Sequence, residues 1–224
     1  MRKINIGAGP LWKSDGWESL DNVQGTKPEK WQHFGKCWET NLPSNVYDIV
    51  FTSHTLEHIP QFRIEKTFYE INRIMKIGGT IRILVPDLYS TAKAYVSKNK
   101  SFFRRRKNYD EGLGIGHNFV RQIVSPGGQT IALNCEYDEI IGGYAHLYCY
   151  DFDSMSKLLK KWGFSGIKKC SPGKSSILEM RPHQHFVCDD KKYDMKDNFI
   201  VKKKYLEKSK TFYQSGFDKS WTGQ

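Results

Sequence analysis

The chain has 224 residues, of which 38% are hydrophobic and 14% aromatic, so it is too apolar to be disordered and long enough for one domain with a core. No apolar run reaches the roughly 20 residues of a membrane span. The net charge of +11 favours polyanions, membrane surfaces or phosphate-bearing substrates, although a lysine-rich solvated surface explains it equally well. The five cysteines are widely spaced, without a CxxC pair, and indicate a reduced cytoplasmic protein without a zinc site.

The first predicted strand, Lys3–Ile6, runs directly into a turn formed by Gly7, Ala8 and Gly9. Glycine tolerates positive φ and has no Cβ, so such a turn lets a ligand approach the backbone closely. Trp12 stands where dinucleotide-binding proteins have their third glycine, which argues against a nicotinamide cofactor. The turn therefore predicts a ligand-binding loop, with a simple turn as the alternative.

A second strand is predicted at Trp17–Leu20, and Asp21 and Asn22 follow it. A carboxylate at this strand end suits a ribose because it accepts hydrogen bonds from both vicinal hydroxyls. A plain turn is the alternative. Only eleven residues separate Gly9 from Asp21, so the first helix is expected to be very short or absent. Residues 37–43 are compatible with the end of a third strand.

The stretch 47–60 (YDIVFTSHTLEHIP) is the most informative part of the chain. It begins with an apolar run typical of a strand buried on both faces of a parallel sheet, and it turns polar at Ser53 and His54. Ligands of open α/β sheets bind beyond the carboxyl ends of strands, so these two side chains are candidate ligand contacts. Glu57 and His58 are expected to order the start of the next helix.

The remaining elements follow from hydrophobic periodicity and from capping residues. Helices are predicted at 61–76, 88–98 and 151–162, with glycines at 78 and 79 ending the first of them, and strands at 80–85, 164–169 and 198–204. Residues 99–150, which follow the strand at 80–85, hold many glycines and most of a basic cluster (98–107), and they predict a substrate lid or insertion. Residues 206–224 are expected to form a polar basic tail.

Alternating strands and helices predict an α/β fold, a doubly wound Rossmann-like and mostly parallel sheet with a nucleotide-like ligand at its carboxyl edge. The order of the motifs resembles class I S-adenosylmethionine-dependent methyltransferases, and more closely their compact type 11 group, which is associated with bacterial surface-glycan genes. The resemblance is carried by segments 3–10 (KINIGAGP), 16–21 (GWESLD), 48–59 (DIVFTSHTLEHI), 71–79 (INRIMKIGG), 82–88 (RILVPDL) and 146–164. It implies a methyltransferase domain over residues 1–205 with a truncated first helix.

The resemblance also implies a site for S-adenosylmethionine at the carboxyl edge of the sheet. The backbone of Gly7, Ala8 and Gly9 would face the amino-acid part of the cofactor, and Asp21 with Asn22 would hold its ribose. The other implied contacts are Glu39, Thr40 and Leu42 near the adenine, and Ser53, His54 and Glu57 near the methionine moiety. Two positions depart from the family pattern: Asn5 replaces the usual acid of the first strand, and Glu39 lies one residue closer than usual to the following Leu-Pro.

Methyl transfer to a hydroxyl needs a general base, and histidine has the side-chain pKa best matched to neutral pH. His117 and His146 flank the predicted lid, so either is a candidate catalytic base, with a surface or structural histidine as the alternative. Asp87, at the end of the fifth strand, is a further candidate base or a hydroxyl ligand. His183 and His185 resemble half of a metal site without a third ligand, so no metal is expected.

The predicted function is O-methylation of a sugar hydroxyl in surface polysaccharide or lipopolysaccharide biosynthesis by a cytoplasmic enzyme. The acceptor would be a small molecule or glycan, with a diphosphate-linked precursor as one option, and peripheral membrane contact is left open. The alternatives are a nucleic-acid methyltransferase and a non-catalytic cofactor-binding protein. The charge and the FFRRRK segment favour nucleic acid. The missing Asn/Asp-Pro-Pro-aromatic motif and the absence of any known RNA-binding module argue against it.

Overall fold

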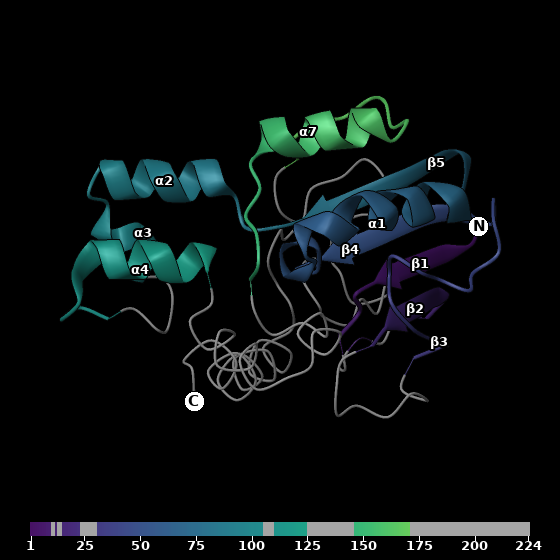
Figure 1. The fold of residues 1–224 in the computed structure, drawn as a ribbon, viewed down its shortest axis with the longest axis horizontal. Helices are drawn as coiled ribbons and strands as arrows, with labels where there is room; N and C mark the ends of the chain where they lie inside the picture. Colours follow the sequence, from purple (N-terminus) through teal and green to yellow (C-terminus); the bar gives the residue numbers. More distant parts are fainter. Residues whose placement is uncertain (10–11, 13–14, 23–30, 105–109, 125–145, 171–224) are drawn as a thin grey trace.

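The strands form one five-stranded parallel sheet, which lies in the right half of Figure 1. The computed structural model describes residues 1–9, 12, 15–22, 31–104, 110–124 and 146–170. The strands are β1 (Lys3–Ile6), β2 (Trp17–Asp21), β3 (His33–Phe34), β4 (Tyr47–Ser53) and β5 (Met75–Leu84). Their order in the sheet is β3-β2-β1-β4-β5, and every pairing is parallel. This order confirms the predicted Rossmann-like sheet, and it places the switch point, where ligands bind, between β1 and β4.

The helices fall into two groups (Figure 1). They are η2 (Leu56–His58, a 3-10 turn), α1 (Gln61–Ile74), α2 (Leu88–Val96), α3 (Lys100–Arg104), α4 (Gly114–Ile123) and α7 (Phe152–Lys161). Helix α1 lies along β4 and β5, and α7 packs next to it. Helices α2, α3 and α4 pack on one another to one side of the sheet, where the rings of Tyr95 and Phe119 stack with their centroids 4.7 Å apart.

The two faces of the sheet are buried in different ways. On one face, Ile4 and Val50 pack against Ile71 and Ile74 of α1. On the other face, indole rings cover the strands in the described part of the chain. Trp12 stacks on Phe51 with ring centroids 6.1 Å apart, and Trp17 and Trp31 belong to the same cluster. Each buried aromatic ring removes about 150–250 Å² from water, so a few tryptophans cover an area that a helix would otherwise cover.

Helices α1 and α7 have the features that the sequence predicts. In α1 the apolar stripe is buried against the sheet. In α7 the Asp151 side chain accepts a hydrogen bond from the Ser154 backbone N–H at 2.8 Å, and the Ser154 hydroxyl completes a capping box. Gly163, with φ of +82°, follows the C-terminal end of the helix. Met155 and Leu159 of α7 join the same core cluster as residues of α1, so the second helix is held on the first.

Three predictions about the elements are wrong. Residues 37–43 form no strand; β3 lies earlier because His33 and Phe34 pair with Leu20 and Asp21, while Trp38 and Leu42 pack into the core clusters. Residues 164–169 form no strand either, since Phe164 and Ile167 pack against the core around α1 and α7.

The third error concerns the start of β5. This strand begins at Met75, so the glycines at 78 and 79 lie inside a strand and do not end α1. Tyr47 pairs with Met75 and Ile49 with Thr80, so an irregular register absorbs the extra residues.

Several predictions lie outside the described residues. They are the strand at 198–204, the tail at 206–224, the domain end at 205 and much of the basic cluster at 98–107. Between β1 and β2 the described residues are not helical, and the others there are not described, so the truncated first helix stays a prediction. The predicted insertion contains helices α3 and α4. Among the helices that the structure describes, none combines the length and the apolarity needed to cross a bilayer.

Candidate active site

The turn after β1 is shaped by its glycines. Gly7 and Gly9 have φ of +70° and +69°, a conformation that other residues adopt only with strain. A Cβ on Gly7 would overlap the side chain of Thr55, whose hydroxyl lies 3.4 Å from the Gly7 carbonyl oxygen and 3.3 Å from that of Ile6. Gly7 therefore makes room for Thr55, a contact that the sequence did not indicate.

Asp21 joins the end of β2 to this turn. One carboxylate oxygen accepts a hydrogen bond from the Gly9 backbone N–H at 2.6 Å, and the other accepts from the Asn22 N–H at the same distance. The residue is only 8% exposed. Asp21, the residue predicted to bind the ribose, is thus in direct contact with the predicted binding loop, as the parallel pairing of β1 and β2 requires.

Two buried polar side chains lie on β1 and β4, on either side of the switch point. Ser53 and Asn5 are each 1% exposed, and neither has a hydrogen-bond partner for its side chain among the described residues. An unmet buried polar group costs about 1–3 kcal/mol, so such groups mark a place where a ligand would supply the partner. Together with the glycine turn and Asp21, they fit a polar ligand such as S-adenosylmethionine.

A cluster of one glutamate and three histidines follows β4. His54 has a positive φ of +51°, and its Nδ1 lies 3.0 Å from Glu57 Oε1. His146 Nε2 lies 3.9 Å from the same oxygen, and the His146 ring meets that of His58 edge-on at 4.8 Å between centroids. Glu57 is fully buried. We call this group (His54, Glu57, His58 and His146) the histidine cluster.

Burial shifts the pKa values of the acid and of the imidazole in this cluster in opposite directions. Burial raises the pKa of Glu57, but the hydrogen bond with His54 and the nearby imidazoles outweigh it and lower the pKa to about 2. Burial lowers the pKa of His146 to about 3, so this ring is neutral at pH 7. The cluster therefore holds an ionised carboxylate beside a neutral imidazole.

The segment 146–150 carries His146 into the cluster. The backbone N–H groups of Leu147 and Tyr148 donate to the Glu57 carbonyl oxygen at 2.7 and 3.1 Å. Tyr150 accepts a backbone hydrogen bond from Leu88 at 2.8 Å, so the same segment is also tied to the residues after β5. His146 thereby reaches Glu57 across the whole predicted insertion, and no local pattern in the sequence indicates this contact.

The other two candidate bases have different surroundings. Asp87 begins α2, where its carboxylate accepts hydrogen bonds from Ser90 at 2.6 Å and from Lys169 at 3.1 Å. His117 lies half-buried on α4, within the group of helices beside the sheet. Only His146 of the three is placed in the histidine cluster by the contacts of the structure, and the catalytic role of each stays a prediction.

The residues expected near the adenine are held by α1. Glu39 forms an ion pair with Lys66 at 3.8 Å. The backbone N–H and the hydroxyl of Thr40 donate to Glu70 at 2.9 and 2.6 Å. Leu42 is buried in the core on the α1 face of the sheet. These contacts give each residue a structural role, and contact with an adenine stays a prediction.

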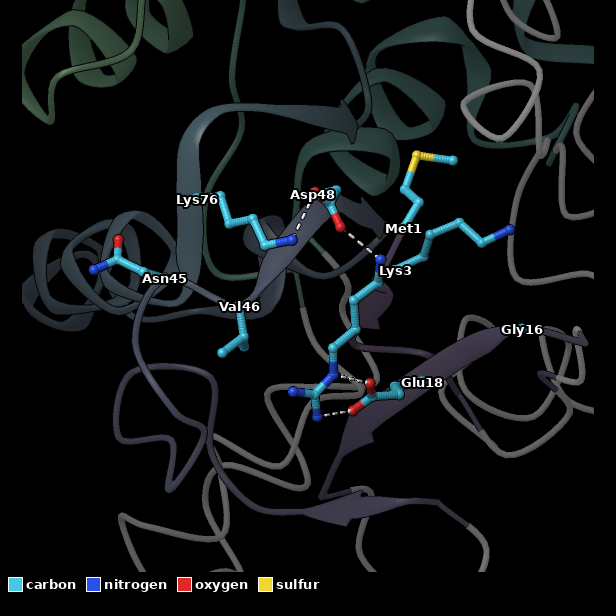
Figure 2. Close-up of a pocket in the computed structure, with 9 residues that line it drawn as sticks. Met1, Lys3, Gly16, Glu18, Asn45, Val46, Asp48 and Lys76 are labelled. Atoms are coloured by element: carbon cyan, nitrogen blue, oxygen red, sulfur yellow. Dashed lines mark hydrogen bonds and ion pairs between the residues drawn. The ribbon is translucent and has the colours of Figure 1, made fainter.

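Two pockets are found in the described residues, and no member of the histidine cluster lines either of them. One, of about 500 Å³, opens at the amino edge of the sheet, and Figure 2 shows Glu18, Asp48 and Lys76 in its wall. Its charges are paired with one another: Arg2 binds Glu18, and Lys76 donates to Asp48 at 2.9 Å. The other, of about 520 Å³, lies between the starts of α1 and α7. The amino edge is the wrong edge of the sheet for a nucleotide-like ligand.

Comparison with known proteins finds a family model that is similar to part of the chain. A family model described as a methyltransferase domain matches residues 18–83, from β2 to β5, which is less than a third of the chain. The match supports an S-adenosylmethionine-dependent methyltransferase with S-adenosylmethionine as its cofactor, and it confirms the predicted class of enzyme. It gives no support for the surface-glycan group in particular.

One similar solved structure is that of phosphoethanolamine N-methyltransferase 2 from Haemonchus contortus in complex with S-adenosyl-L-methionine. The two chains are 17% identical with a TM-score of 0.29, and the match covers 72% of this chain and 44% of that chain. The chain thus spans less than half the length of that protein. No curated protein matches the chain.

Proposed function

We propose that the chain transfers the methyl group of S-adenosylmethionine to a sugar hydroxyl of a surface polysaccharide, a lipopolysaccharide or one of their nucleotide-linked or lipid-linked precursors. The observation that carries the proposal is the histidine cluster, in which Glu57 binds His54, the residue before the Thr55 that contacts Gly7 of the glycine turn. A hydroxyl must lose its proton as it is methylated, and a histidine oriented by a buried carboxylate is suited to take it.

The cofactor would bind across the switch point of the sheet. Asp21 would accept hydrogen bonds from the ribose hydroxyls, and the turn at Gly7 and Gly9 would lie along the cofactor. Ser53, whose hydroxyl has no hydrogen-bond partner within the described part of the chain, would gain one. S-adenosylmethionine supplies an activated methyl group on a sulfonium, so the protein needs to contribute position and a proton acceptor rather than covalent chemistry.

Within the cluster, His54 is the better proton acceptor. His146 is buried and its pKa is lowered to about 3, so it is a weak base at neutral pH. His54 keeps 25% of its side chain exposed, and its Nδ1 faces the Glu57 carboxylate. A substrate hydroxyl would meet the ring at Nε2. As the acceptor oxygen gains the methyl group, its proton passes to this ring, and Glu57 stabilises the imidazolium that forms.

The positive φ of His54 agrees with this role. Residues other than glycine rarely adopt a positive φ, and the backbone strain that it causes is concentrated at functional sites. The turn at His54 directs its ring toward Glu57, three residues later, at the carboxyl end of β4. A strained residue followed by a buried carboxylate is what a site needs to hold a base in one orientation.

The acceptor is proposed from charge. Lys98 precedes α3 by two residues, and Lys100 is the first residue of this helix, in the part of the predicted insertion that the structure describes. Lysine ammonium groups suit a diphosphate, so a nucleotide-linked or lipid-linked sugar is the favoured acceptor. Such precursors are made in the cytoplasm, which is where we place the enzyme.

The test is methyl transfer with purified protein and radiolabelled S-adenosylmethionine. We expect label in a nucleotide sugar or a glycan fraction, and a large loss of label in the His54→Gln variant. The control His33→Gln removes a histidine from β3 and should leave the transfer unchanged. If RNA alone is labelled, the sugar acceptor is wrong and the chain is a nucleic-acid methyltransferase. Cofactor binding without label in any acceptor would indicate a non-catalytic protein.

A further inference from the structure

Three groups that bind metals converge in the histidine cluster. One ligand atom each from Glu57, His58 and His146 lies within 4.8 Å of the other two. The sequence analysis predicted no metal site because His183 and His185, which resemble half of one, had no evident third ligand. The fold supplies a different set, since η2 contributes Glu57 and His58, and the end of the predicted insertion contributes His146.

The chemistry of this set points to a transition metal. Two imidazoles and one carboxylate are the protein ligands of many zinc and iron enzymes, in which further coordination positions stay open for water or substrate. In a tetrahedral zinc site with bonds of about 2.0–2.1 Å, neighbouring ligand atoms lie about 3.3 Å apart. The ligand atoms would therefore have to draw together by at most about 1.5 Å. Rotation of the side chains about their χ angles supplies a movement of this size.

A second observation points to a ligand at the same place. Glu57 is 0% exposed, and its Oε2 has no hydrogen-bond partner among the described residues. A buried carboxylate oxygen without a partner is costly, and a cation satisfies it better than any neutral group. In the described part of the chain, the charged groups that act on Glu57 are the imidazoles of His54, His58 and His146, so a metal ion is the fitting cation.

The surroundings of the three groups resemble the outer shell of a metal site. Metal-binding carboxylates and histidines are held in place by further hydrogen bonds. His54 Nδ1 lies 3.0 Å from the second oxygen of Glu57. The His146 ring makes a hydrogen bond with the backbone of Gln122 in α4, while its Nε2 faces Glu57. Glu57 and His146, the two buried ligands, are therefore each held in orientation by a hydrogen bond to a further residue.

We propose that Glu57, His58 and His146 bind a divalent transition-metal ion, and that the open position of this ion takes the hydroxyl oxygen of the methyl acceptor. Metal coordination lowers the pKa of a bound hydroxyl and fixes its position, so His54 can remove the proton more easily. The second half of this inference rests on the proposed methyl transfer, whereas metal binding itself does not. An acceptor with two neighbouring hydroxyls, as in a sugar, can chelate such an ion.

Metal binding is tested on the full chain after treatment with a chelator. Titration calorimetry with Zn²⁺ should show one ion per chain, and addition of Co²⁺ should give the visible absorption bands of a coordinated ion. Loss of an outer hydrogen bond costs 10–100-fold in metal affinity, so loss of a direct ligand in His146→Gln or His58→Gln should cost about 100-fold or more.

The control variant is His33→Gln, which removes a histidine that binds Glu18 on β2. It should leave the affinity for Zn²⁺ unchanged. His146 is buried, so its replacement can impair folding, which circular dichroism would reveal. The half-exposed His58 then provides the decisive variant. Absence of stoichiometric binding, or equal binding by His58→Gln and His33→Gln, would overturn the metal site.

Methyl-transfer assays separate this inference from the proposed function. If both hold, the chelator abolishes labelling of the sugar and Zn²⁺ or Mn²⁺ restores it. Full labelling of a metal-free protein would refute the role of the metal in holding the acceptor. One Zn²⁺ per chain without any methyl transfer would instead refute the proposed function and leave the metal site standing.

Discussion

The two edges of the sheet each carry a half-buried or buried glutamate with a pKa lowered to about 2, but only one of them has the features of a site. At the amino edge, Glu18 is bound by Arg2, by His33 at 2.6 Å and by the Tyr47 hydroxyl at 2.7 Å. At the carboxyl edge, Glu57 is fully buried, and one of its oxygens has no hydrogen-bond partner among the described residues.

The difference shows how to separate a structural network from a candidate site. Glu18 accepts four hydrogen bonds, about as many as a carboxylate has lone-pair sites, so a ligand would have to break one of them. A buried glutamate with an unmet oxygen is incomplete, so a ligand or a metal ion adds to its interactions. The amino edge also has a defined pocket, lined in part by Glu18 (Figure 2), so the presence of a pocket does not by itself identify the site.

Replacing Glu57 by glutamine should have the largest effect. A neutral amide cannot stabilise an imidazolium at His54, so we expect the kcat of methyl transfer to fall by about 10²–10⁴-fold. The matched variant Glu18→Gln should leave kcat unchanged, because the amino edge takes no part in the reaction. Both are checked by initial rates under saturating cofactor. Similar losses in the two variants would remove the distinction between the edges.

Replacing Gly7 by alanine should cost the most stability. The added Cβ meets Thr55 and also forces alanine into a positive φ, so overpacking of about 1–3 kcal/mol adds to about 1–2 kcal/mol of backbone strain. Gly16, at the amino edge, has φ of +74°, and a Cβ there would meet only Lys3 atoms at 3.9 Å or more. Gly16→Ala should therefore show the strain without the overpacking.

Urea unfolding of the two glycine variants measures this difference. If Gly7→Ala and Gly16→Ala lose the same free energy of unfolding, Thr55 does not fill the space over Gly7. A larger loss for Gly7→Ala confirms that this turn is packed by the protein itself as well as shaped for a ligand.

Replacing Asp21 by asparagine should weaken cofactor binding without abolishing the fold. Hydrogen bonds to a charged group contribute about 1.5–3 kcal/mol, which corresponds to about 10–100-fold in the Kd for S-adenosylmethionine. The control Asp48→Asn changes an aspartate at the amino edge that binds Lys76 and the Arg2 backbone N–H. Titration calorimetry should give an unchanged Kd for this control. Equal Kd values for the Asp21 variant and the unchanged protein would exclude Asp21 from the cofactor site.

The predictable parts of the fold are those that local sequence determines. Strands β1, β2 and β4 and helices α1 and α7 follow from apolar runs, helical periodicity and a capping aspartate, Asp151. Strand β3 was not predicted because it has only two residues and is defined by its pairing with β2.

Helix α4 has two glycines in its first turn, Gly114 and Gly116, which disfavour a helix. The Asn118 side chain donates a hydrogen bond to the Gly114 carbonyl oxygen at 2.7 Å and stabilises this turn.

The candidate site also has a part that the sequence predicts and a part that it does not. Gly7, Asp21 and Ser53 could be found because strand ends of a parallel sheet meet at one edge. The meeting of His146 with Glu57 could not be found, since it depends on the path of the chain through α2, α3 and α4. Without that contact the sequence showed isolated histidines, and the metal-binding arrangement stayed hidden.

The smallest effect concerns the stability of the amino edge at low pH. Burial raises the pKa of Glu18, but hydrogen bonds from Arg2, His33 and Tyr47 outweigh it and lower the pKa from 4.5 to about 2. A lowered pKa stabilises the folded state above the ordinary value, and this contribution is lost as the pH falls from 4.5 towards 2. After allowance for solvent screening, the contribution is about 1–2 kcal/mol.

The comparison of unchanged protein with Glu18→Gln isolates this contribution, because Glu57 and Glu70 have pKa values lowered in the same range and remain in both proteins. Urea unfolding at pH 7 should show the variant to be less stable by about 1–2 kcal/mol. At about pH 3, which lies inside the titration window, the difference should shrink. If the difference in stability is the same at both pH values, the bonds to Glu18 act through packing rather than through charge. The amino edge would then not be an ionic network, and its contrast with the histidine cluster would fail.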